Sequence, residues 1–84
     1  MDIETYHRID QFFHDYFLLE REIFISQSSE EIMIKLQLKD AILHALKEFF
    51  GAGRSKHFLY GTLKIDFKIT KINNKLNLKM YGNN

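Results

Sequence analysis

The chain has 84 residues, of which 45% are hydrophobic and 27% charged, with a formal net charge of +1 and no cysteine, proline or tryptophan. Its length allows one small domain over residues 1–84, and the absence of cysteine excludes disulfides and thiolate metal sites. No apolar run approaches the roughly 18 residues of a membrane span, and the acidic, polar start differs from a secretory signal, so we expect a soluble, cytoplasmic protein.

Residues 2–18 are predicted to form an amphipathic helix. Drawn at about 100° per residue, the apolar side chains, five of them aromatic, share one broad arc, and polar side chains lie opposite. Asp2 is the expected N-cap, and Glu4 and Arg8 have the spacing of an i,i+4 ion pair. This helix is therefore expected to supply a large part of the core.

Residues 20–38 are predicted to form a β-hairpin. Apolar and polar residues alternate through residues 32–38, which is the period-two pattern of a strand. A turn at residues 28–29 sets a register in which apolar residues face apolar ones and Glu22 faces Lys35.

Residues 40–50 are predicted to form a second helix, with Asp40 as the N-cap and Gly51 as the residue that ends it. Residues 58–81 are predicted to form a second hairpin, because apolar residues alternate on both sides of an Asn-Asn turn at residues 73–74. The turn sets these opposite pairs: Phe67 with Met80, Lys68 with Lys79, and Ile69 with Leu78.

The order of elements is therefore αββαββ, and the fold class is α+β. The expected architecture is a two-layer sandwich of one four-stranded antiparallel sheet with both helices on one face. Residues 35–39 and 75–79 have similar sequences, which suggests an αββ pseudo-repeat over residues 2–39 and 40–82.

The solvent face of the second hairpin is expected to carry four lysines, Lys64, Lys68, Lys75 and Lys79, with Asp66 as the one carboxylate among them. Like charges placed opposite each other on a sheet are mildly destabilising. Three explanations remain open: a polyanionic partner, protection of an edge strand against aggregation, or neutralisation by the acidic first third of the chain. Residues 1–31 hold eight acidic and two basic residues, whereas residues 32–84 hold three acidic and ten basic ones.

The loop over residues 51–57 contains two glycines, a serine and the cationic candidates Arg54, Lys56 and His57. Its backbone N–H groups and charges suit a phosphate group, but it lacks the spacing and the context of a P-loop. The alternative is a helix end followed by a polar connection.

Enzyme chemistry has little support in this sequence. It has no cysteine nucleophile and no evident carboxylate pair. His7 and His14 flank Asp10, but they lie about 10 Å apart along a helix, which is too far for one metal ion. We therefore expect no catalytic residue, no metal and no cofactor.

The sequence favours a small non-enzymatic module, of the inhibitor, antitoxin or phage-modulator type, that binds and modulates another protein with an acidic surface. The expected binding residues are Phe24, Met33, Arg54, Lys56, Lys68, Lys79 and Tyr81. The alternative is a nucleic-acid-binding protein that uses the loop 51–57 and the hairpin 62–80. Its binding residues would be Arg54, Lys56, Lys64, Lys68, Lys75 and Lys79. A homodimer is a third option.

Overall fold

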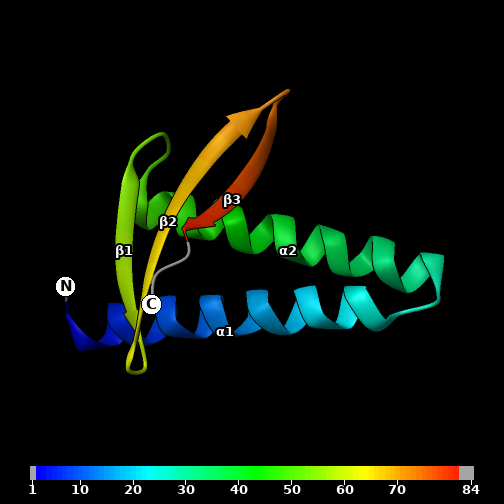
Figure 1. Cartoon of the computed structure of the whole chain (residues 1–84), viewed down its shortest axis with the longest axis horizontal. Helices are drawn as coiled ribbons and strands as arrows, with labels where there is room; N and C mark the ends of the chain where they lie inside the picture. The colour runs from blue at the N-terminus through cyan, green and yellow to red at the C-terminus, as the bar shows by residue number, and fades with distance from the viewer. Residues whose placement is uncertain (1, 82–84) are drawn as a thin grey trace. The chain divides into compact units, whose positions relative to one another are not determined.

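The computed structural model describes residues 2–81 and shows two helices followed by three strands (Figure 1). The elements are α1 (Ile3–Ile25), α2 (Ser29–Phe50), β1 (Ser55–Tyr60), β2 (Leu63–Ile72) and β3 (Lys75–Tyr81). The class is α+β, as expected. The order αββαββ and the four-stranded sheet are wrong, because the strands expected within residues 20–38 are helical and the sheet has three strands.

The chain divides into two compact units, one up to Ile42 and one from Leu43 onward. We call them the helical unit, with α1 and most of α2, and the sheet unit, with the end of α2 and the three strands. The prediction of one domain over residues 1–84 stays a prediction. The similar segments 35–39 and 75–79 lie in α2 and β3, and residue 82, where the expected second repeat ends, is outside the described residues.

The first helix begins where the sequence predicts. The Asp2 carboxylate accepts a hydrogen bond of 2.7 Å from the backbone N–H of Thr5, and this bond holds the pKa of Asp2 below its ordinary value. The helix does not end at residue 18 but continues to Ile25. Ser26 follows in an extended conformation, and its N–H reaches the carbonyl of Ile23.

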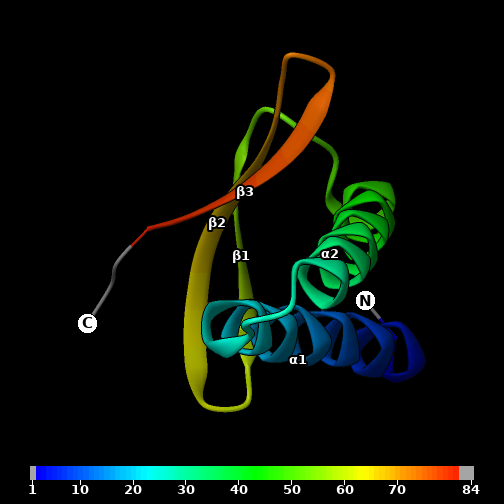
Figure 2. The same ribbon diagram turned by 90° about the vertical axis from the view of Figure 1, so that its right-hand side faces the viewer.

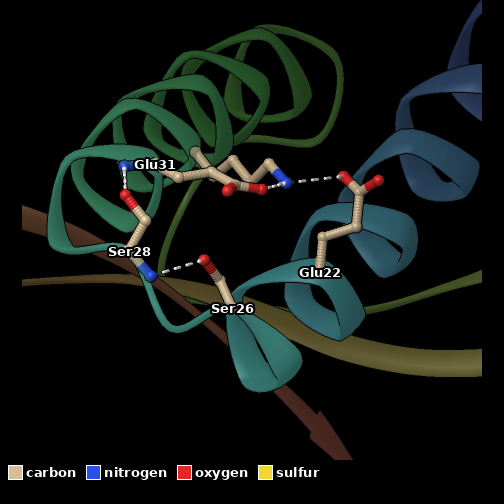
Figure 3. Close-up of polar contacts among 5 residues, drawn as sticks. Glu22, Ser26, Ser28 and Glu31 are labelled. Atoms are coloured by element: carbon tan, nitrogen blue, oxygen red, sulfur yellow. Dashed lines mark hydrogen bonds and ion pairs between the residues drawn. The ribbon is translucent and has the colours of Figure 1, made fainter.

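The second helix begins after Ser28, which acts as its N-cap and replaces the expected turn at residues 28–29. The Ser28 hydroxyl accepts a hydrogen bond of 3.3 Å from the Glu31 N–H, and the Ser28 N–H donates to the Ser26 hydroxyl, also at 3.3 Å (Figure 3). Lys35 then donates to the Glu31 carboxylate one turn later, which lowers the pKa of Glu31 and raises that of Lys35. Asp40 lies inside this helix, so the predicted N-cap there is wrong.

Ion pairs join the two helices of the helical unit, which run antiparallel (Figure 1). The Lys35 ammonium lies 3.6 Å from the Glu22 carboxylate, and the Lys39 ammonium lies 3.5 Å from the Glu20 carboxylate. The predicted partners Glu22 and Lys35 therefore do meet, but between helices and not between strands. Lys39 also lies 4.9 Å from the centroid of the Tyr16 ring, and Tyr16 is buried.

Three antiparallel strands in the order β1-β2-β3 form the sheet of the sheet unit (Figure 2). The register of β2 and β3 confirms the three predicted pairs, and the turn residues Asn73 and Asn74 both have positive φ, as a type I′ turn requires. The strand β1 was not predicted as such. A turn at Gly61, with φ +62°, joins it to β2.

One face of the sheet is buried and contains the largest buried side chain of this unit, Phe67. Phe50, the last residue of α2, packs edge-to-face on Phe67 with ring centroids 4.9 Å apart, and on Phe58 at 6.3 Å. The helix ends as predicted, because Gly51 has φ +77° and its N–H donates to the Lys47 carbonyl at 2.7 Å.

Neither helix within residues 2–81 has an apolar stretch that could cross a bilayer.

Replacement of Phe67 by alanine is expected to lower the free energy of unfolding by about 3–5 kcal/mol, because it removes a fully buried ring and leaves a cavity. Urea denaturation followed by circular dichroism measures the change. Leu63→Ala on the same strand is the control, since Leu63 is more than half exposed. A similar loss for both variants would contradict the placement of Phe67 in the core and of Leu63 at the exposed end of the same face.

Burial, and to a lesser degree the charge of Glu20, raises the pKa of Tyr16 to about 12. The folded protein therefore resists ionisation that the unfolded chain undergoes near pH 10, and stability should fall from there as the pH rises through about 12. Absorbance titration of the phenolates should show a late phase near pH 12 that Tyr16→Phe removes. A late phase that persists in this variant would refute the assignment.

Candidate partner-binding surfaces

The helical unit leaves large apolar side chains exposed on both helices. No residue from Phe17 to Ile42, a stretch that is described throughout, is buried. Phe24 near the end of α1 is 89% exposed, and Met33 near the start of α2 is 61% exposed. These two predicted binding residues therefore lie on the surface of the helical unit. The other large apolar residues exposed in this stretch are Leu18, Ile25, Ile34, Leu36 and Leu38.

The exposure follows from the sequence pattern of α2. Residues two apart on a helix point about 200° apart, so a period-two apolar pattern places apolar side chains on two opposite faces. Ile32 and Leu36 lie on one face, and Ile34 and Leu38 lie on the other. Two neighbouring helices bury only one strip of each other, which leaves a second apolar strip of α2 in contact with solvent.

A furrow of about 400 Å³ lies between the two helices on the helical unit. We call it the apolar furrow, and its lining residues are Phe12, Asp15, Leu18, Leu19, Leu38, Ala41 and Ile42. Asp15 is the one charged residue of this lining, and its carboxylate accepts a hydrogen bond of 2.8 Å from the Gln11 side chain. The furrow therefore offers a wide apolar surface with a single negative charge.

Sequence reasoning missed the apolar furrow, although its residues were available. Phe12 and Leu19 were assigned to the core, and Leu38 was assigned to a strand. The missed signal was the capping-box sequence of Ser28 and Glu31, which predicts a helix and so brings α2 back along α1.

The sheet unit carries its positive charge mainly on one face. The strand register places the four lysines Lys64, Lys68, Lys75 and Lys79 on the face opposite the buried one. We call this the lysine face. Lys68 lies directly opposite Lys79, as predicted, and the Lys79 ammonium is 5.9 Å from the centroid of the Tyr81 ring.

The remaining predicted binding residues are dispersed. The register places Lys56 on the buried face of the sheet, opposite Phe67, and Arg54 precedes β1 in the connection from α2.

Residues 55–57 of the predicted phosphate loop lie in β1. The N–H of Gly51 bonds to Lys47, and that of Gly53 bonds to the Ile69 carbonyl at 2.8 Å. The two glycine N–H groups of this loop are therefore occupied by backbone carbonyls, which fits the alternative of a helix end followed by a polar connection.

A polar hollow of about 310 Å³ lies where β1 begins and β3 ends beside the middle of β2, and it is lined by Ser55, Lys56, His57, Asp66 and Tyr81. His57, Asp66 and Tyr81 stand in one cross-strand row, since His57 pairs with Asp66 and Asp66 pairs with Tyr81. The row places two exposed aromatic rings and the Asp66 carboxylate on the lysine face.

Within residues 2–81, no three histidine or acidic side chains come together as metal ligands, and His7 and His14 are exposed on α1. Comparison of the chain with models of protein families, with characterised proteins and with solved structures finds no match. The function is therefore inferred from the two surfaces.

Replacement of Lys79 by glutamate is expected to stabilise the protein by roughly 0.2–1 kcal/mol, because a negative charge then lies across from the positive charge of Lys68. The control is Lys71→Glu, which makes the same charge change on the other face, opposite Leu76. Chemical denaturation at low salt compares the two variants. Equal stabilisation by both would mean that the total charge, and not the Lys68–Lys79 pair, sets the effect.

Proposed function

We propose that the protein is a small, non-enzymatic, cytoplasmic protein-binding module whose helical unit packs against an amphipathic helix of a partner protein. The observation that carries this proposal is the exposed apolar surface of α1 and α2 between Phe17 and Ile42. Large exposed apolar patches on small proteins are typical of interaction sites.

A helix is the partner element that fits this surface. Two antiparallel helices present a groove into which the side-chain ridge of a third helix packs, and helix-in-groove binding is a common recognition mode. The apolar furrow supplies such a groove. Leu18 and Leu38, which line it from α1 and α2, are 45% and 50% exposed, so a helix packed there would remove further apolar surface from water.

Charge favours a basic partner helix. Residues 1–42 contain nine acidic and four basic residues, and Asp15 stands in the apolar furrow. Two of the four bases, Lys35 and Lys39, are engaged with carboxylates of the same unit. A partner with lysine or arginine beside its apolar stripe is therefore favoured, because complementary charge speeds encounter and improves specificity. The acidic partner expected from the sequence would suit the sheet unit, which holds Arg54, Lys56, Lys68, Lys79 and Tyr81.

Two synthetic helical peptides test this proposal. They share one leucine stripe, and carry either lysines or glutamates beside it. The lysine peptide is expected to bind more tightly in a fluorescence anisotropy titration. The double variant Leu18→Gln/Leu38→Gln should weaken its binding about tenfold or more, because each substitution removes apolar contact area. Asp15→Asn should reduce the preference for lysine.

The matched control is Leu63→Gln, which alters an equally exposed leucine of the sheet unit. Equal weakening by the control, or tighter binding of the glutamate peptide, would contradict the proposed site. Sedimentation equilibrium of the protein alone tests whether a second copy of this chain, and not a partner helix, occupies the apolar furrow. A stable dimer that Leu38→Gln dissociates would replace the partner helix with another chain of this protein.

A further inference from the structure

We propose that the lysine face of the sheet binds the phosphate backbone of a single-stranded nucleic acid. The site belongs to the sheet unit and uses none of the residues of the apolar furrow. Residues 51–84 hold seven basic residues and one acidic residue, so this segment cannot neutralise its own charge. A polyanion supplies the missing negative charge, and the release of its counterions drives binding.

The lysines form a single line of charge. Lys64, Lys68 and Ile72 are four residues apart on β2, which corresponds to steps of about 13 Å. Lys79 lies opposite Lys68, and Lys75 lies opposite Ile72. The four lysines therefore stand at three positions along one axis, and the closest pair, Lys68 and Lys79, lies on neighbouring strands whose backbones are about 5 Å apart.

A single line of charge favours one strand over a duplex. The two phosphate chains of a duplex flank grooves about 6 and 12 Å wide, and a protein that contacts both chains needs two separated rows of cations. The lysine face offers one row. A peptide chain with acidic side chains would also meet this row, but it has no bases to stack on the exposed rings.

Aromatic and polar groups accompany the charges. The exposed rings of Tyr81 and His57 flank Asp66 on the lysine face, at the position between Lys64 and Lys68 along β2. Rings next to a basic track are the usual means of holding unpaired bases. Thr70 and Asn77, which pair across β2 and β3 on the same face, add hydrogen-bonding groups between the lysines.

Fluorescence anisotropy with a labelled oligouridylate of about 16 nucleotides tests the proposal. Four lysine–phosphate contacts predict a slope of log K against log salt of about −3, at about −0.7 per contact. The double variant Lys68→Gln/Lys79→Gln should lower the affinity at low salt and reduce the slope to about −1.4. Tyr81→Leu should weaken binding at every salt concentration without changing the slope.

The control is Lys71→Gln, which removes one positive charge from the same strand but on the opposite face. It should change affinity and slope less than Lys68→Gln alone. Three results would overturn the proposal: no binding at low salt, equal effects of Lys71→Gln and Lys68→Gln, or tighter binding of polyglutamate or of a duplex than of the single strand. Circular dichroism of each variant establishes that the fold is kept. A negative result with the oligonucleotide would not bear on the proposed helix-binding site, because the peptide experiment tests that site through other residues.

Discussion

Two packed helices can hide only one strip of each other from water, and this constraint determines the surface of the helical unit. The sequence of α2 has apolar side chains on two opposite faces. Ile32 and Leu36 occupy one face, and Ile34 and Leu38 occupy the other. Whichever strip α1 covers, the second remains exposed. The exposed apolar surface is therefore a consequence of the sequence pattern, and a third helical element is the simplest means of covering it.

Charge follows the same division of the chain. Residues 1–42 hold five more acids than bases, and residues 43–84 hold six more bases than acids. In the helical unit, Lys35 and Lys39 are held against acidic side chains of the same unit. In the sheet unit, Lys68 and Lys79 stand opposite each other. The two units therefore carry net charges of opposite sign, and the apolar furrow and the lysine face share no residues.

Sequence reasoning succeeded where a local signal determines the conformation. The Asp2 cap, Gly51 after α2, and the Asn-Asn turn each require a particular backbone conformation, and all three were located correctly. The register of β2 and β3 followed from the turn, and so the lysine face was predictable. The strand β1 was missed because it contains one buried residue, Phe58, and its polar composition resembles a loop.

The error over residues 20–38 has a different cause. Apolar residues at every second position fit a strand with one buried face, and they fit equally a helix with two apolar faces. A window of seven residues does not separate the two. The capping-box sequence at Ser28 and the i,i+4 pair of Glu31 and Lys35 favour the helix. The contact of Glu22 with Lys35 was nevertheless predicted, because any antiparallel connection centred near residues 28–29 brings these two positions together.

The same ambiguity explains why the apolar furrow could not be predicted. It requires that residues 12–19 lie beside residues 38–42, and that neighbourhood exists only when residues 29–38 are helical. A strand of this sequence would have turned Ile32, Ile34, Leu36 and Leu38 toward one core. The helix leaves Ile34, Leu36 and Leu38 exposed, so the conformation that the sequence pattern failed to predict is also the one that forms the exposed apolar surface of the helical unit.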